Sequence, residues 1–530
     1  MKPFQEKLSG YLWHPFLFVL FALLSLLVAN LQRLPATHIL RPLMICFFFT
    51  TLLLCLARWL TKDWHRAGLI TGLFLLLIFS YGHVYGLLEG STLFDLDVGR
   101  HRVLLSLYAL LLIGGGFLIL KIRRSPIQWT IWLNVITALL VLTQIGQLAL
   151  AGYKSHQLNV LVQGDGETVT NEPIAFPTSE PDNRRDIYYI ILDTYTRQDA
   201  FKAVLDFDNS SFIEELRSRG FTIAECSLSN YTSTSASLIA SLDMLYLDEL
   251  NPMLGTGYRN LSFLDPYLQN NRVIASLAQA GYTIVAFESG YMPTELPGVD
   301  VYLTPETGNV FTGGLTRYES LLLQSSAGIL VYDFSSRLPA GMRYFLDATY
   351  VAHRQRILYE LDKLGRLEEL PTTKFVFAHI LAPHTPFVFA RDGQPVERNT
   401  PFTLNDDPEL GDPSLYRQRF IDQTIFINSQ VLQLVDRILA QPGDPVIILQ
   451  GDHGVPSSGI WATAILYAIY LPGEEGTLYS LETPVNTFRL VFNQLFDAGL
   501  PLSPDRSCRF NRSDPASCEI IPDPVPDCQH

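Results

Sequence analysis

The chain has 530 residues, of which 48% are apolar and 17% charged, and its formal net charge is −14. This length exceeds one ordinary domain, and the apolar excess indicates membrane-spanning segments. Residues 1–150 hold 12 Lys and Arg against 5 Asp and Glu, whereas the remainder holds 26 against 47. The acidic remainder excludes nucleic acid as a partner, because binding phosphates needs basic surface.

The N-terminal part contains five apolar runs, at about 14–31, 38–57, 68–88, 103–120 and 128–151. Each approaches the roughly 20 residues that cross a bilayer. We therefore predict a domain of about five transmembrane helices over residues 1–151. The N-terminus and the second and fourth loops carry eight Lys and Arg, against four in the first and third loops. This asymmetry predicts a cytoplasmic N-terminus, and an odd number of spans then places the rest outside.

The remainder divides into a polar linker (152–184), an α/β domain (185–507) and a tail rich in Cys and Pro (508–530). Apolar β-branched runs such as IYYIIL, KFVFAHI and VIILQG alternate with helical patterns, which predicts a mainly parallel central sheet. Four cysteines lie outside the membrane part. They allow three pairings, among which the sequence does not choose, although a disulfide in the tail is expected: Cys226, Cys508, Cys518 and Cys528.

Polar side chains follow three of the predicted strands. Asp193 follows the apolar run in IILDTY, and His379 and His384 lie in AHILAPHTPF. Asp452 and His453 follow the third strand, in QGDHG. Alone, each has an ordinary structural explanation as a cap, a core histidine or a turn. Functional sites of α/β sheets lie at the carboxyl ends of strands, so their joint occurrence there indicates a site.

A stretch dense in hydroxyl groups, SNYTSTSASLIAS at 229–241, runs into a helical pattern. A helix N-terminus favours anions, which suits a nucleophile that attacks a phosphoryl group. Asp oxygens and His nitrogens suit zinc or manganese, and a nearby cation or base activates a Thr hydroxyl. A basic group such as His384 or His379 can bind the phosphoryl group or protonate a leaving alkoxide.

These motifs resemble the sulfatase-like branch of the alkaline phosphatase superfamily, in particular membrane-bound phosphoethanolamine transferases and lipoteichoic acid synthases. The resemblance implies an alkaline phosphatase/sulfatase-like α/β domain beside the transmembrane helices. The pattern T-x-T-x-x-S, here residues 232–237, implies that Thr234 is the nucleophile, with His384 as a second catalytic residue. It implies the metal ligands Asp193, Thr234, Asp452 and His453, where the transferases usually have Glu in place of Asp193.

Three further residues are candidates for substrate contacts. His379 has the H-x4-H spacing of the family relative to His384, and it is also compatible with a core position. Ser237 belongs to the hydroxyl stretch. Arg197 fits a phosphate contact and an exposed helix start equally well. The histidine that often follows DHG in the transferases is absent from GVPSSGIWATAILYAIY, and so is the C-x-P-S-R sequence of formylglycine sulfatases.

The resulting hypothesis is a metal-dependent, multi-pass enzyme of the plasma (inner) membrane with an extracytoplasmic catalytic domain. It would transfer a phosphoethanolamine- or phosphoglycerol-like head group from a membrane phospholipid to a glycan or lipid acceptor, through a covalent Thr intermediate. One alternative is a hydrolase of phosphate or sulfate esters, which shares the first half-reaction. Another is a non-catalytic membrane module with the same fold.

Overall fold

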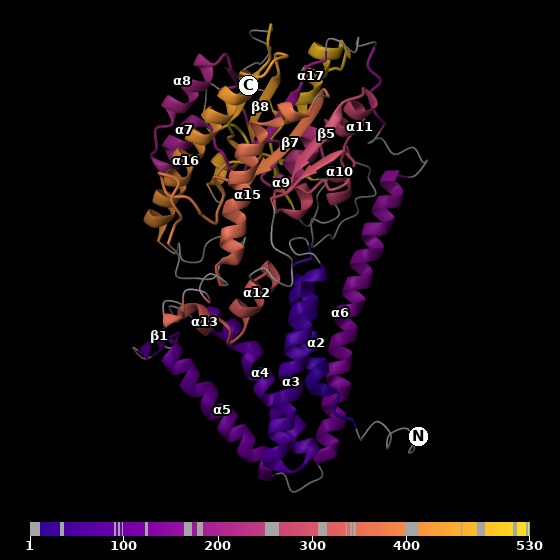
Figure 1. Cartoon of the computed structure of the whole chain (residues 1–530), viewed down its shortest axis with the longest axis vertical. Coiled ribbons are helices and arrows are strands. Elements are labelled where there is room, and N and C mark those ends of the chain that lie inside the picture. Colours follow the sequence, from indigo (N-terminus) through magenta and orange to yellow (C-terminus); the bar gives the residue numbers. More distant parts are fainter. Residues whose placement is uncertain are drawn as a thin grey trace. The chain divides into compact units, whose positions relative to one another are not determined.

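The computed structural model describes residues 11–31, 36–88, 92–93, 96–97, 99–121, 126–163, 172–177, 184–249, 264–305, 315–334, 337–339, 342, 346–370, 372–397, 412–456, 458–473, 483–511, 517–525 and 528 (Figure 1). The chain forms two compact units. The helical unit comprises Met1–Tyr153, Gly308–Thr349 and Arg398–Thr403, and the α/β unit comprises Lys154–Thr307, Tyr350–Glu397 and Leu404–His530. Within the predicted linker, residues 152–163 are helical, and residues 164–171 and 178–183 lie outside the described residues.

The helical unit contains the predicted apolar helices: α2 (His14–Ala29), α3 (Leu40–Thr61), α4 (Trp64–Leu88), α5 (His101–Lys121) and α6 (Pro126–Gln163). Within the described part of the chain, four helical stretches are long and apolar enough to cross a membrane: Ala36–Thr61, Trp64–Leu88, His101–Lys121 and Pro126–Tyr153. The first predicted span forms a shorter apolar helix of 16 residues, α2. The last helix continues to Gln163 instead of ending near 151. A membrane bundle at the N-terminus is thereby confirmed.

A segment from the middle of the chain belongs to the helical unit, although the sequence predicts it within the α/β domain. It contains α12 (Arg317–Ser325) and α13 (Ile329–Asp333). The Tyr318 hydroxyl donates to the Leu23 carbonyl (2.7 Å), and Glu319 forms a buried ion pair with Arg41. Gly82 permits a close approach, because a Cβ there would lie 2.2 Å from the Gln324 carbonyl oxygen. These contacts fix α12 against α2 and α4.

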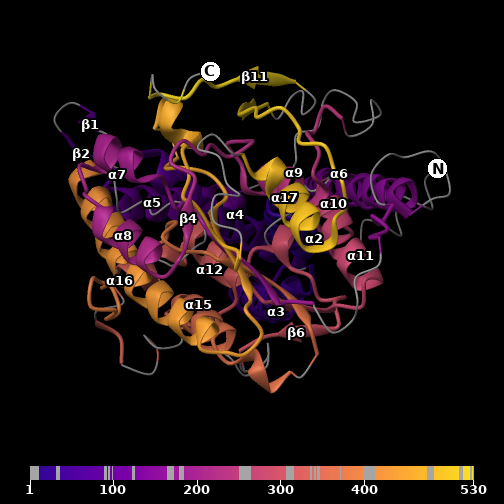
Figure 2. The ribbon, with the colours of Figure 1, turned by 90° about the horizontal axis from the view of Figure 1, so that it is seen from above.

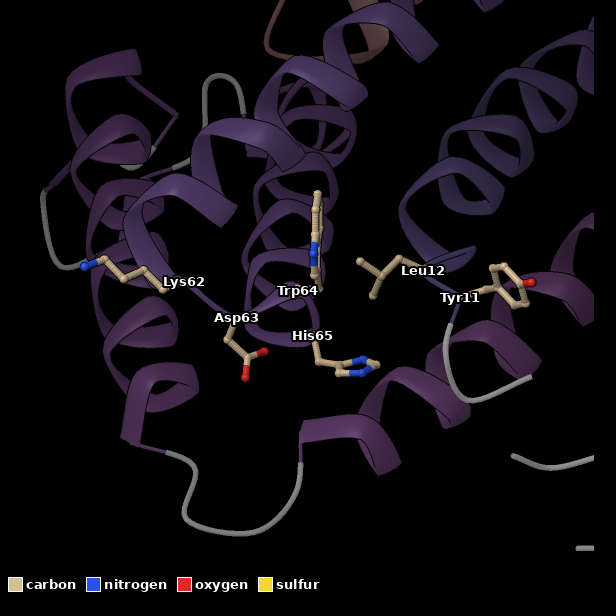
Figure 3. A pocket seen from close by; sticks show the side chains of 6 residues that line it. All are labelled: Tyr11, Leu12, Lys62, Asp63, Trp64 and His65. Carbon is tan, nitrogen blue, oxygen red and sulfur yellow. The ribbon is translucent and has the colours of Figure 1, made fainter. Parts of the chain in front are cut away.

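The turn between α3 and α4 forms a polar end of the helical unit. Together with the residues before α2, it lines a cavity of about 530 Å³ (Figure 3), whose lining consists of Tyr11, Leu12, Lys62, Asp63, Trp64 and His65. Lys62 has a left-handed backbone (φ 57°) that ends α3, and in Figure 3 its ammonium extends away from the other labelled side chains. His65 Nδ1 lies 3.2 Å from Thr130 Oγ1 and so connects α4 to α6.

The α/β unit is built on a seven-stranded sheet in the order β4-β9-β8-β3-β7-β5-β6. The five strands from β8 to β6 are parallel, whereas β9 is antiparallel to β8 and β4 to β9. This arrangement confirms the predicted mainly parallel sheet. The strands are β3 (Ile187–Leu192), β4 (Thr222–Ile223), β5 (Thr283–Phe287), β6 (Val301–Leu303), β7 (Lys374–Ile380), β8 (Val446–Gly451) and β9 (Tyr467–Tyr470).

Helices cover both faces of the sheet, so the central strand β3 is buried along its whole length and is apolar throughout. Figure 2 shows α9 and α17 on one side and α15 and α16 on the other. Tyr189 of β3 packs in one core cluster with Leu238 of α9 and Phe488 of α17. The helices are α7 (Gln198–Leu205), α8 (Ser210–Ser218), α9 (Thr234–Asp243), α10 (Asp265–Gln269), α11 (Arg272–Gln279), α15 (Ala348–Leu364), α16 (Pro413–Leu439) and α17 (Thr487–Phe496).

Two disulfides stabilise the tail, one within it and one to the preceding part of the α/β unit, and they resolve the pairing that the sequence leaves open. Cys508 pairs with Cys518 across the hairpin of β10 (Cys508–Phe510) and β11 (Cys518–Ile520). Cys226 pairs with Cys528 near the chain terminus. Cys46 and Cys55, both in α3, are free thiols.

A buried acid ends α9. Asp243 is fully buried, and its Oδ1 accepts a hydrogen bond from the Arg272 backbone N–H (2.8 Å). Its Oδ2 has no hydrogen-bond partner within the described part of the chain. Burial raises the pKa of Asp243 to about 8, in spite of that hydrogen bond and the nearby Arg272 charge. The folded protein therefore carries this carboxyl in its neutral form at neutral pH.

We predict that Asp243→Asn stabilises the protein increasingly as pH rises from 5 to 8. Over this range the folded state holds a proton that the unfolded state, with a pKa near 3.9, has lost. The free energy of unfolding of the wild type therefore falls by up to about 1.4 kcal/mol per pH unit. The Asn side chain does not titrate, so the variant does not lose stability in this way. The measurement is the thermal unfolding midpoint of the detergent-solubilised chain across that range. Asp497→Asn is the control, since Asp497 is exposed and Asn tolerates its left-handed backbone. A gain independent of pH would contradict the assignment.

Candidate metal centre and active site

The sheet brings three chemically active strand ends together. β3 lies between β7 and β8, and Ile191 is in register with His379 on one side and Gln450 on the other. Side chains alternate between the faces of a strand. Asp193, His379 and Asp452 therefore project to the same face of the sheet as Ile191. The Ile191 side chain belongs to the core cluster that also contains Leu238 of α9. Strand order and register thus place all three on the face that α9 covers.

The distances among these side chains are those of a compact polar cluster. His379 Nε2 lies 3.6 Å from Asp193 Oδ2, and His453 Nε2 lies 3.4 Å from Asp452 Oδ2 and 3.9 Å from Asp193 Oδ1. Ligand atoms of Asp193, His379 and Asp452 all lie within 4.8 Å of one another. All four residues are buried. Two carboxylates and two imidazoles therefore converge on one small volume.

The orientation of each imidazole is fixed by its other nitrogen. His379 Nδ1 lies 2.9 Å from Thr294 Oγ1, whose own hydroxyl donates to the Tyr291 carbonyl. The contact with Thr294 holds the imidazole so that Nε2 faces Asp193, where in its neutral form it can bind a cation. His453 Nδ1 similarly lies 2.9 Å from the Gly454 carbonyl. Both histidines direct Nε2 at carboxylates, as metal-binding histidines with hydrogen-bonded second nitrogens do.

The cluster contains polar atoms that need a cation. Within the described residues, Asp193 Oδ1, His379 Nε2 and Asp452 Oδ2 have no hydrogen-bond partner. The second oxygen of Asp452 is held by the Thr194 backbone N–H (2.9 Å). Lone pairs that face one another in a buried site are costly unless positive charge lies between them. The donor set, carboxylate oxygen and imidazole nitrogen, fits a divalent ion such as zinc or manganese.

The electrostatics of the cluster reflect its mixed charges. Burial by itself would raise the pKa of Asp193, but the imidazoles of His384, His379 and His453 hold it well below its ordinary range. Burial would lower the pKa of His453, but Asp452 and Asp193 raise it above its usual value. Each group is therefore biased toward its charged form by the opposite charges that it faces.

The Gly of the DHG triplet is required by close packing. A Cβ on Gly454 would lie 2.4 Å from the Trp461 carbonyl oxygen, and the Gly454 N–H donates to the Ala462 carbonyl (2.8 Å). The chain after β8 therefore folds back directly over His453. The same returning segment receives a hydrogen bond from the hydroxyl stretch, since the Ser229 N–H donates to the Thr463 carbonyl (2.7 Å).

The predicted nucleophile lies at the start of α9. The helix begins at Thr234, which is 9% exposed, and Ser233 is its N-cap residue. Thr232, two residues earlier, lines a cavity of about 390 Å³ together with His453. The hydroxyl stretch and the metal-competent histidine thus border the same cavity. The role of Thr234 as nucleophile and metal ligand remains a prediction.

His384 lies beside the cluster. Its backbone N–H donates to the Asp193 carbonyl (3.1 Å), and its ring centroid is 6.4 Å from that of His453. The ring is only partly buried, and Nδ1 contacts the Thr385 carbonyl. A histidine in this position, oriented through Nδ1, can exchange a proton through Nε2 with a ligand in the site.

Two of the candidate substrate contacts make structural interactions instead. Ser237 is fully buried, and its hydroxyl donates to the Tyr231 carbonyl (2.7 Å). The Arg197 guanidinium is 5% exposed and pairs with Asp523 (2.8 Å) and Asp199 (2.7 Å). The structure brings neither side chain into the Asp–His cluster. It does bring in His379, for which the sequence left a core role open.

No family model and no curated protein matches the chain. Similar solved structures include the C-terminal periplasmic domain of EcEptC from Escherichia coli in complex with zinc (12% identity, 67% of this chain and 97% of that chain, TM-score 0.42). Another is the integral membrane protein lipooligosaccharide phosphoethanolamine transferase A from Neisseria meningitidis (13% identity, 96% of this chain and 98% of that chain, TM-score 0.37). A third is the lipoteichoic acid synthase LtaP from Listeria monocytogenes (11% identity, 64% of this chain and 77% of that chain, TM-score 0.36).

We predict that the wild type binds about one equivalent of a divalent metal, and that Asp452→Asn and His379→Gln each weaken binding at least tenfold. Thr294→Val should weaken it about tenfold through His379, as loss of an outer hydrogen bond does at other sites. The measurement is metal content by mass spectrometry after dialysis against graded chelator. Asp206→Asn is the control, because that carboxylate is 64% exposed. Metal retention by Asp452→Asn equal to that of the control would contradict the assignment.

Proposed function

We propose that this chain is a metal-dependent membrane enzyme that transfers a phospho head group from a phospholipid to an alcohol acceptor, through a covalent intermediate on Thr234. The head group is phosphoethanolamine- or phosphoglycerol-like, and the acceptor is a glycan or lipid. The observation that carries the proposal is the buried Asp–His–Asp cluster on the sheet face that α9 covers, with the hydroxyl stretch bordering the same cavity as His453.

A divalent ion held by Asp193, Asp452, His379 and His453 would supply charge that lowers the pKa of a nearby hydroxyl and offsets charge on phosphoryl oxygens. In the first half-reaction the Thr234 hydroxyl loses its proton to water. Its oxygen attacks phosphorus, so that a Thr–phosphorus ester bond forms and the bond from phosphorus to the diacylglycerol oxygen breaks. His384 donates a proton to that leaving oxygen.

The second half-reaction reverses these roles. His384, now neutral, takes the proton of the acceptor hydroxyl, whose oxygen attacks phosphorus. The Thr234 ester bond then breaks, and Thr234 recovers a proton from water. The backbone N–H groups at the start of α9 favour the anionic phosphoryl group throughout. The same residue thus acts as acid and then as base, and no proton is gained or lost over the cycle.

Two features support an extracytoplasmic location for the α/β unit. It contains two disulfides, and such bonds persist in oxidising compartments. The free cysteines lie in α3, which is one of the candidate membrane helices. With the N-terminus cytoplasmic, as the loop charges favour, the apolar helices anchor the enzyme in the membrane that supplies its lipid donor.

We expect a head-group adduct on Thr234 when the full chain is incubated with vesicles of phosphatidylethanolamine and phosphatidylglycerol. Mass spectrometry of the peptide that spans Thr234 detects the adduct, and its mass identifies the head group. His384→Ala should increase the adduct fraction, because the proton acceptor of the second half-reaction is lost. Thr234→Ala should abolish it and Thr234→Ser should retain it. Ser233→Ala, which removes a hydroxyl with no capping hydrogen bond, should leave it unchanged.

Two results would contradict the proposal in different ways. Head-group release with no adduct in the wild type or in His384→Ala would indicate a hydrolase that uses water directly. An unmodified peptide with no release of head group and no bound metal would indicate a non-catalytic module.

A further inference from the structure

The C-terminal tail lies directly beside the hydroxyl stretch. The Cys508 N–H donates to the Asn230 carbonyl (2.8 Å), the Ser507 hydroxyl donates to the Ser229 carbonyl (2.7 Å), and Tyr231 forms a parallel bridge with Cys508. Residues 506–510, which we call the strap, thus run alongside residues 229–231. Thr234 begins its helix three residues further along.

The strap is fixed at several points. The disulfide Cys508–Cys518 closes the hairpin that begins in the strap, and Cys226–Cys528 ties the end of the tail to the segment that precedes the hydroxyl stretch. Between them, Asp523 forms its buried ion pair with Arg197. The structure shows a segment whose position relative to the hydroxyl stretch is determined by covalent and buried polar bonds.

The strap presents one arginine to the cavity beside the metal cluster. Cys508 is fully buried, and because strand side chains alternate, its neighbour Arg509 projects to the other side. Arg509 lines the 390 Å³ cavity with Thr232, His453 and parts of the segment 454–462. Of the described residues that line it, Arg509 is the one with a permanent positive charge. Its partner on the hairpin, Glu519, lies 3.4 Å away, and both side chains are more than half exposed.

The chemistry of this position favours an anionic ligand. An ion pair between two exposed side chains contributes little, so Glu519 does not prevent the guanidinium from binding a stronger partner. Arginine matches phosphoryl oxygens with paired N–H donors. Residues 151–530 carry 21 more acidic than basic side chains, so the net negative charge of this part of the chain repels an anionic ligand. A guanidinium beside His453 offsets that repulsion where the phosphoryl group must be held.

We propose that Arg509 is a substrate-binding residue that holds a phosphoryl oxygen of the donor in the cavity beside His453. This inference rests on the proposed function. It assigns the tail a direct part in the site, because the strap and its disulfides hold Arg509 at the wall of the cavity that His453 also lines. The ligand chemistry is a phosphate ester anion, and free phosphate shares it, which makes inorganic phosphate a suitable probe.

The test is calorimetric titration of the full-length, zinc-loaded, detergent-solubilised chain with orthophosphate. We expect Arg509→Gln to raise the Kd about five- to tenfold, as loss of a partly exposed charged hydrogen bond does, and Arg509→Lys to raise it less. Arg506→Gln is the matched control. It removes the same charge from the strap, but the Arg506 guanidinium pairs with Asp248 and stacks on Tyr246. Its Kd should stay within about twofold of the wild type.

Three results would overturn the inference: an unchanged Kd in Arg509→Gln, an equal loss in Arg506→Gln, or no phosphate binding by the wild type at millimolar concentration. Kinetics with lipid vesicles separate it from the proposed function. If both hold, Arg509→Gln raises the donor KM with little change in kcat. An adduct on Thr234 with an unchanged donor KM in Arg509→Gln would refute the role of Arg509 alone. Phosphate binding that depends on Arg509, without any adduct, would refute the proposed transfer alone.

Discussion

Two buried carboxylates that face each other across adjacent strand ends are the constraint on which the site depends. Asp193 and Asp452 have ligand oxygens within 4.8 Å of each other, and among the described residues each has an oxygen without a hydrogen-bond partner. Two like charges at such a separation repel by roughly 3.5 kcal/mol at an effective dielectric constant of 20. The nearby histidines, oriented through Thr294 and Gly454, turn their Nε2 atoms toward these carboxylates. A divalent cation removes this repulsion and satisfies every one of these atoms together.

The fold generates that constraint from a simple topology. Parallel strands end at the same edge of a sheet, and placing β3 between β7 and β8 makes three strand ends neighbours. Register then determines which side chains share a face. The same face carries α9, so the hydroxyl stretch, the metal cluster and the strap of the tail meet without any long excursion of the chain. Packing of the core and assembly of the site are consequences of the same strand order.

Much of this arrangement could be predicted from the sequence. The apolar run before Asp193 and the one before Asp452 identify buried strands, and the polar residues after them mark strand ends. The sequence does not give strand order or register, so it could not decide whether His379 is a core residue or joins the cluster. The sequence does not indicate the role of Thr294, because that role is a single hydrogen bond to a histidine 85 residues away.

Other features depend on contacts between distant segments of unremarkable local pattern. Nothing in the sequence around Tyr318 and Glu319 indicates that α12 packs against α2 and pairs with Arg41. The disulfide pairing is one of three that composition permits. Arg197 is a candidate phosphate contact in the sequence, but in the structure it pairs with Asp523, a residue 326 positions later in the chain. Such partners are determined by tertiary structure, whereas hydrophobic periodicity reports local structure.

X-ray absorption at the metal edge of the full-length, zinc-loaded protein tests the central claim most directly. We predict a shell of oxygen and nitrogen ligands at about 2.0–2.1 Å with imidazole scattering, and a weaker imidazole contribution in His379→Gln. Sulfur ligands at about 2.3 Å, or an imidazole contribution that is the same in His379→Gln as in the wild type, would contradict it.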